Sequence, residues 1–142
     1  MKIEQKLCVV LDTNIILASI SHNSPYRIIF DRFKAKAFDI FITNDILLEY
    51  EEKLKEKFDI EVAEDVLNAF HNRSNVFEIK TWFSFSLIIY DVEDNKFSDC
   101  AIASNADYLV SNDKHFNVLK SVGFPKVQII KIDEFVELLK II

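Results

Sequence analysis

The sequence predicts an α/β fold built on a central parallel sheet with helices covering both of its faces. Short apolar segments alternate along the chain with helical patterns of about ten residues or more, which is typical of a parallel sheet. The run L-C-V-V-L at residues 7–11 is continuously apolar, as a central strand buried on both faces requires. Half of the 142 residues are apolar, so we expect residues 1–142 to form a single domain with its own core.

We expect a sheet of about four to five strands. Each predicted strand is a short apolar run bounded by polar or turn residues. Residues 82–89 (W-F-S-F-S-L-I-I) have no clean helical period and are expected to be a connector with some strand character. The predicted strands are residues 7–11, 39–42, 75–80, 108–110 and 127–132.

The predicted helices follow residues that cap helix amino termini, such as Thr13, Thr43 and Asp133, and each shows an apolar face at helical spacing. Gly123-Phe124-Pro125 is expected to form a turn between the helix at 116–122 and the final strand. The predicted helices are residues 13–21, 25–37, 43–58, 61–73, 94–104, 116–122 and 133–139.

Composition narrows the classes of function. A single glycine argues against the glycine-rich loops that bind nucleotide phosphates. Cys8 and Cys100 lie in predicted apolar elements, which favours free thiols over a disulfide or a zinc site. The sequence shows neither a secretory leader nor an apolar run of roughly 20 residues, so we expect a cytoplasmic protein without a membrane segment.

The net charge of −6 at first disfavours a nucleic-acid partner, because phosphate backbones are normally bound by clusters of Lys and Arg. This objection weakens if several acids line one metal site, since bound divalent cations would cancel much of their charge. Charge alone therefore does not decide the question.

The acids follow the predicted sheet in a pattern that indicates a metal site. Asp12 follows the first strand and Asp113 follows the strand at 108–110, and parallel neighbours end at the same edge. Asp99 lies in the apolar helix before that strand, and Glu49 lies one turn into the helix at 43–58. Carboxylates that share a site raise one another's pKa, and a hard cation with oxygen ligands, Mg²⁺ or Mn²⁺, relieves this.

Several residues have two interpretations from the sequence. Asp94 is either a helix-start acid or a metal ligand, and Glu49 cannot be chosen over Asp45 from spacing alone. Four short polar residues could orient carboxylates or serve as ordinary caps: Thr13, Asn14, Asn95 and Ser111.

Two further groups of side chains have a structural default. The basic residues of the second helix are expected to be solvated, with RNA contact as the alternative, and they are Arg27, Arg32, Lys34 and Lys36. The phenylalanines are expected in the core rather than in a base-stacking platform, and they include Phe30, Phe33, Phe38, Phe41, Phe83 and Phe85. The histidines are expected at polar or helix-surface positions, and they are His22, His71 and His115.

The motifs D-T-N at 12–14, D-N-K-F-S-D-C-A-I-A at 94–103 and A-D-Y-L-V-S-N-D at 106–113, with Glu49 between them, resemble those of the PIN-domain ribonucleases. The resemblance covers essentially the whole chain and is close to the VapC-like branch of toxin-antitoxin toxin components. Asn112 departs from the pattern, because many relatives carry glycine or arginine at this position.

The resemblance implies a three-layer α/β/α sandwich and cleavage of RNA that depends on one or two Mg²⁺ or Mn²⁺ ions. It further implies a homodimer and a small inhibitory antitoxin protein. By motif, the catalytic acids are Asp12, Glu49, Asp99 and Asp113, with Asp94 as an additional metal ligand.

Two other functions are compatible with the sequence. The first is a PIN-fold binding module whose acidic cluster is not catalytic and which acts by docking a partner. The second is a phosphate-accepting receiver-type domain, which would need Asp12 as the acceptor and a lysine at a later strand end, where Lys131 is a weak candidate.

Overall fold

Strand β1 lies at the centre of a five-stranded sheet in the order β3-β2-β1-β4-β5, and all neighbouring strands run parallel. The computed structural model describes residues 6–81, 84–88 and 94–142. The predicted α/β fold with a parallel sheet is confirmed. The strands are β1 (Cys8–Leu11), β2 (Asp39–Ile42), β3 (Val76–Glu78), β4 (Tyr108–Val110) and β5 (Ile129–Ile130).

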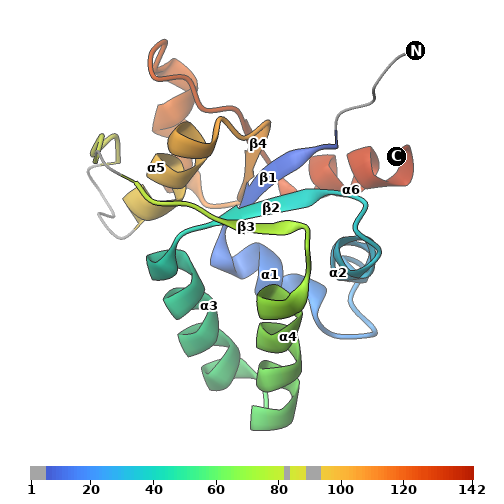
Figure 1. Cartoon of the computed structure of the whole chain (residues 1–142). Helices are drawn as coiled ribbons and strands as arrows, with labels where there is room; N and C mark the ends of the chain where they lie inside the picture. Colours follow the sequence, from blue (N-terminus) through green and yellow to red (C-terminus); the bar gives the residue numbers. More distant parts are fainter. Residues whose placement is uncertain (1–5, 82–83, 89–93) are drawn as a thin grey trace.

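Helices cover the sheet from both sides (Figure 1). Helices α1, α3 and α4 lie below the sheet in this view, whereas α5 lies above it and packs on β1, β2 and β4. The helices are α1 (Thr13–Ser19), α2 (Arg27–Lys34), α3 (Asn44–Lys57), α4 (Ile60–Asn72), α5 (Asn95–Ser104), the 3-10 helix η2 (Lys114–Ser121) and α6 (Ile132–Lys140).

Strand β1 is buried on both faces. Val9, Val10 and Leu11 are each 0% exposed, although consecutive side chains of a strand point to opposite faces. A continuous apolar run is therefore needed here in place of an alternating one. As a result, Asp12, the residue that follows Leu11, lies at the edge of the core.

Aromatic rings join several helices in the core. Phe33 of α2 stacks on Phe70 of α4 with 4.9 Å between ring centroids, and Tyr50 of α3 packs on the same Phe70 at 5.4 Å. Phe38 packs edge-on against Phe135 of α6 at 5.2 Å. These rings are buried, so the abundance of phenylalanine is explained largely by the core.

The other phenylalanines that were expected in the core differ in how deeply they are buried. Phe30 is buried, Phe41 is half-buried, and Phe85 is 38% exposed. Phe83 lies outside the described residues, as do parts of the predicted connector at 82–89. Residues 84–88 of that connector form neither helix nor strand.

Side-chain caps set where α3 and α4 begin. The Thr43 hydroxyl accepts a hydrogen bond from the Ile46 amide at 3.2 Å, and Asp59 caps α4 in the same way through Val62 at 3.0 Å. Helix α5 ends at Asn105, whose φ of 54° is left-handed, a conformation that asparagine tolerates.

The carboxyl-terminal elements differ from the prediction. Helix α6 begins at Ile132 after Lys131, and Asp133 lies within its first turn instead of capping it. A distant residue provides a cap, because the Asn112 side chain accepts a hydrogen bond from the Ile132 amide at 2.9 Å. The strand predicted at 127–132 is also shorter, with ladder pairing only at Ile129 and Ile130.

The segment after β4 is a 3-10 helix that begins earlier than the predicted helix at 116–122. Asp113 caps it by accepting a hydrogen bond from the His115 amide at 2.9 Å, so the first turn starts at Lys114. Both cysteines are free thiols; Cys100 is buried and Cys8 is only partly buried.

Across the described part of the chain, the helices are too short or too polar to cross a membrane.

The buried hydroxyl of Tyr50 donates a hydrogen bond to the carbonyl oxygen of Leu11, the last residue of β1. We expect Tyr50→Phe to lower the free energy of unfolding by about 1–2 kcal/mol, because a buried carbonyl loses its donor. Urea unfolding followed by circular dichroism measures the difference. Tyr108→Phe at a half-buried position is the matched control and should change stability by less than about 0.5 kcal/mol. Equal effects of the two substitutions would contradict the role of the Tyr50 hydroxyl.

Candidate active site

Two adjacent strands end in acids at the same edge of the sheet. Leu11 of β1 and Val110 of β4 are register partners, and the Asp12 amide donates to the Val110 carbonyl at 3.0 Å. Ser111 then links the two acids. Its hydroxyl donates to Asp12 Oδ2 at 2.7 Å and accepts from the Asp113 amide at 3.0 Å. The structure thus brings together the strand-end acids that parallel topology predicted to converge.

The Asp12 carboxylate is only 6% exposed, and its pKa is raised from 3.8 to about 6. Burial is the main cause, because it disfavours the charged form, and the nearby carboxylates of Asp113 and Glu49 raise the pKa further. Hydrogen bonds from the Ser111 hydroxyl and the Thr13 amide act in the opposite direction. The chain therefore places an acid where its ionisation is costly.

Glu49 faces this edge from α3. One of its oxygens accepts a hydrogen bond from the Thr13 hydroxyl, and the other lies 2.8 Å from the Lys96 ammonium of α5. Asp45, which the sequence could not separate from Glu49, is exposed one turn earlier. Glu49 is thus the α3 acid that lies next to the Asp12 segment.

Asp99 and Asn95 lie four residues apart on α5, and both contact the segment 84–88. Asp99 is 7% exposed, and its Oδ1 accepts a hydrogen bond from the Phe85 amide at 3.1 Å. The Asn95 side chain makes two hydrogen bonds with the backbone of Ile88, each of 2.9 Å. Both residues therefore anchor a loop to α5 at the amino-terminal part of that helix.

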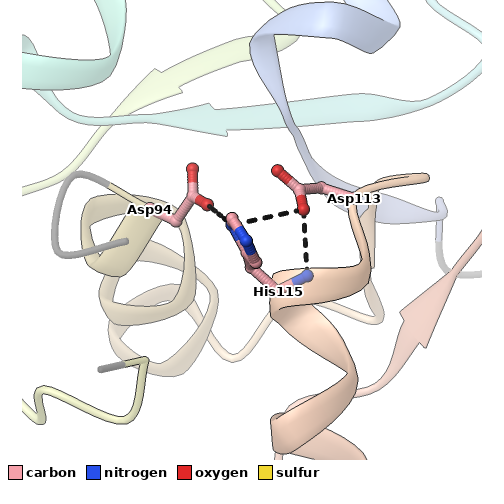
Figure 2. A group of neighbouring side chains, drawn as sticks. All are labelled: Asp94, Asp113 and His115. Carbon is pink, nitrogen blue, oxygen red and sulfur yellow. Dashed lines mark hydrogen bonds and ion pairs between the residues drawn. The ribbon is translucent and has the colours of Figure 1, made fainter. Parts of the chain in front are cut away.

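Asp94 precedes α5, but its side chain makes no capping hydrogen bond. Its Oδ2 lies 3.6 Å from His115 Nδ1, and the same nitrogen lies 3.4 Å from Asp113 Oδ1 (Figure 2). Ligand atoms of these three residues all lie within 4.8 Å of one another, which is close enough for one metal ion. The geometry therefore favours the interpretation of Asp94 as a ligand over that of a simple cap.

The four predicted orienting residues have different surroundings. Ser111 and Thr13 hold carboxylates of the site, as described above, whereas Asn95 holds the loop at Ile88. Asn14 is exposed on α1.

Sequence reasoning missed two residues of this edge, His115 and Lys96. His115 was expected on a helix surface, yet its Nδ1 is buried between two carboxylates. The sequence did offer one signal, namely that His115 lies two residues after Asp113. A capping turn at Asp113 places the His115 ring beside that acid. Lys96 follows Asn95 in sequence, but only the tertiary packing of α5 beside α3 pairs it with Glu49.

The donor set fits a hard divalent cation. Carboxylate oxygens are the ligands that Mg²⁺ and Mn²⁺ prefer, and Asp12, Asp113 and Asp94 offer them after β1, after β4 and before α5. The raised pKa of Asp12 shows that its negative charge is poorly compensated by the protein. A cation at this edge would compensate it.

The basic residues of α2 lie elsewhere. A cavity of about 900 Å³ lies between the end of α1, α2 and α4, and its lining includes Arg27, Lys34 and Lys36 but none of the predicted site residues. Arg27 and Lys34 also lie over the Phe30 ring, at 5.0 and 4.9 Å from its centroid. These cations therefore do not contribute directly to the acidic edge.

A sequence model of the PIN domain matches residues 8–115, a range that contains every acid described above. The chain belongs to the PIN-domain family. No curated protein sequence matches it.

Solved structures of PIN-like fold are similar to this chain at low sequence identity. The crystal structure of VapBC2 from Rickettsia felis bound to a DNA fragment from their promoter contains a chain with a TM-score of 0.60 and 22% identity, covering 88% of this chain and 98% of that one. The DNA-bound VapBC from Salmonella typhimurium has a TM-score of 0.59 and 18% identity, and the match covers 89% of this chain and 98% of that one. The T. brucei RRP44 PIN domain has a TM-score of 0.54 and 10% identity, and the match covers 96% of this chain and 83% of that one. At these identities the similarity establishes a shared fold.

The raised pKa of Asp12 predicts that the contribution of this residue to the stability of the PIN domain falls as pH rises when no metal is present. The folded state holds a proton on Asp12 up to about pH 6, whereas the unfolded state loses it near 3.8. The stabilisation is therefore complete below pH 3.8 and lost as pH rises through 6. Asp12→Asn removes this loss, and its amide oxygen can still accept from Ser111.

In EDTA, we expect the stability of Asp12→Asn relative to wild type to increase between pH 4 and 8 by on the order of 3 kcal/mol. Urea unfolding across this pH range measures the effect. Asp65→Asn, at an exposed position in the middle of α4, is the control and should follow wild type. A pH-independent difference between Asp12→Asn and wild type would contradict the role assigned to burial.

Proposed function

We propose that this PIN domain is a metal-dependent endoribonuclease that hydrolyses RNA phosphodiester bonds and acts as the toxin component of a toxin-antitoxin pair. The observation that carries the proposal is the buried Asp12 carboxylate, with Asp113 and Glu49 close enough to raise its pKa. PIN domains are nucleases, which supports a hydrolase. The single domain proposed for residues 1–142 would then be built around this edge of the sheet.

Asp12, Asp99 and Asp113 would hold one Mg²⁺ or Mn²⁺, and Glu49 with Asp94 would complete this site or hold a second ion. When bound, such an ion lowers the pKa of a water molecule and offsets charge on the phosphate and on the leaving oxygen. No side-chain nucleophile is required. Water is the proposed nucleophile.

The chain's own residues orient the acids. Ser111 donates to Asp12 Oδ2 and so orients this carboxylate at the edge of the sheet. Thr13 and Lys96 occupy the two oxygens of Glu49 and hold its carboxylate toward α1 and α5. Lys96 is half-buried beside the site and would place a positive charge near a bound phosphate.

The partners are proposed from the family resemblance and from the fold neighbours. The structures with TM-scores of 0.60 and 0.59 are VapBC complexes, which supports an antitoxin partner for this chain. A homodimer is proposed on the resemblance alone. Light scattering coupled to gel filtration, with and without a co-expressed antitoxin, measures both associations.

A binding module with a non-catalytic acidic cluster is the second candidate. One observation favours it: the oxygens of Glu49 and one oxygen of Asp99 already have protein partners. In that case the acids hold elements together and need no metal. Calorimetry separates the two functions, because absence of heat with millimolar Mn²⁺ supports the binding module.

We expect Asp12→Asn and Asp113→Asn each to lower RNA cleavage by roughly 100-fold or more, because each removes a carboxylate from the cation site. EDTA should abolish cleavage and Mn²⁺ should restore it. The measurement is the rate of cleavage of a fluorescently labelled total-RNA or oligonucleotide panel. Asp65→Asn, purified in the same way, should cleave at the wild-type rate. Undiminished cleavage by contaminant-free Asp12→Asn would contradict the proposed metal-dependent mechanism.

A further inference from the structure

The His115 imidazole faces two acids from the turn after β4. Its Nδ1 lies 3.4 Å from Asp113 Oδ1 and 3.6 Å from Asp94 Oδ2. Asp94 reaches this point from the start of α5, on the other side of the ring, as Figure 2 shows. We propose that His115 is a nitrogen ligand of a divalent ion held with Asp94 and Asp113, and that it makes this site favour transition-metal dications over Mg²⁺.

The spacing of the three donors suits a common ion. Donors bound at right angles at about 2.1 Å from an ion lie about 3.0 Å apart. The three donor atoms lie within 4.8 Å of one another, and the two distances from Nδ1 exceed 3.0 Å by a few tenths of an ångström. The three donors are therefore close enough for one ion to be shared once the side chains adjust around it.

Asp113 contacts both the backbone and the ring of His115. The His115 amide donates to Asp113 Oδ1 at 2.9 Å, so the same acid caps η2 and lies beside the imidazole. His115 Nδ1 is buried, whereas the side chain as a whole is 33% exposed. The buried nitrogen thus faces the carboxylates, and the outer part of the ring faces solvent.

The chemistry of the donor set determines which ions it favours. Mg²⁺ prefers oxygen ligands, whereas imidazole nitrogen suits transition-metal ions. Asp94 and Asp113 alone would not distinguish strongly between Mg²⁺ and Mn²⁺. Addition of His115 strengthens binding of Mn²⁺ more than binding of Mg²⁺.

An ion pair is the competing role for His115. A protonated ring could hold the two carboxylates without any metal, in which case no nitrogen would bind the ion. The two roles differ in a property that spectroscopy measures directly, namely the magnetic coupling between the ring nitrogen and bound Mn²⁺.

The test is electron spin-echo envelope modulation of Mn²⁺ bound to the full-length chain. The wild-type protein should show modulation from ¹⁴N, and labelling histidine with ¹⁵N should convert it to ¹⁵N modulation. His115→Gln should lose the nitrogen signal, whereas His71→Gln, at an exposed position on α4, should retain it. The labelling arm needs no variant, so it holds even if His115→Gln folds poorly.

Competition between Mg²⁺ and Mn²⁺ for the site provides a second readout. The Mg²⁺ concentration that displaces half of the bound Mn²⁺ should fall roughly tenfold or more in His115→Gln relative to wild type and His71→Gln. Bound Mn²⁺ without nitrogen modulation in wild type, or an unchanged displacement concentration in His115→Gln, would overturn the proposal.

This inference rests on the proposed function through the metal, and the outcomes separate the two. RNA cleavage with bound Mn²⁺ but no nitrogen coupling contradicts the role of His115 alone. Nitrogen coupling without RNA cleavage contradicts the nuclease proposal alone. Failure to bind Mn²⁺ contradicts both.

Discussion

Burial of the Asp12 carboxylate at the end of β1 is the constraint on which the rest of the candidate site depends. The three preceding residues are fully buried, so the chain leaves the core directly at this acid. Desolvation raises its pKa to about 6, and neighbouring carboxylates add to that effect. A protein that needed only a helix cap here would gain nothing from placing further acids beside it. The proposed cation would account for the arrangement, because it would compensate a charge that the fold leaves poorly compensated.

Helix α3 supports this end of β1 in two ways. Tyr50 donates to the Leu11 carbonyl, and the adjacent Glu49 contacts Thr13, so consecutive residues of one helix hold both sides of Asp12. On the other side, Ser111 connects Asp12 to Asp113. Tyr50 and Glu49 belong to α3, whereas Ser111 lies in the short connection between β4 and η2. The same interactions therefore stabilise the sheet edge and orient its acids.

Local pattern was enough to predict the sheet and its acidic edge. The apolar run at 7–11 indicates a buried strand, and parallel topology brings Asp12 and Asp113 together once both strands are recognised. Thr43 could be predicted as a cap because its hydrogen bond spans only three residues.

Features that depend on packing between distant segments could not be predicted. The Asn112 contact that starts α6 at Ile132, and the pairing of Lys96 with Glu49, join residues far apart in sequence. His115 was missed for the same reason, since its second acid, Asp94, belongs to another element. Spacing alone could not choose Glu49 over Asp45, because both acids lie at four-residue spacing on one helix; the family resemblance made that choice.

The most direct test of the central claim is an anomalous difference map from crystals soaked in Mn²⁺ and measured at the manganese absorption edge. The claim is that buried Asp12 after β1 and half-buried Asp113 after β4 serve to hold a divalent cation. We predict an anomalous peak within bonding distance of the carboxylates of Asp12 and Asp113, absent from crystals of Asp12→Asn soaked in the same way. Well-measured data from wild-type crystals with no peak at these carboxylates, at Mn²⁺ concentrations that support RNA cleavage, would contradict the account.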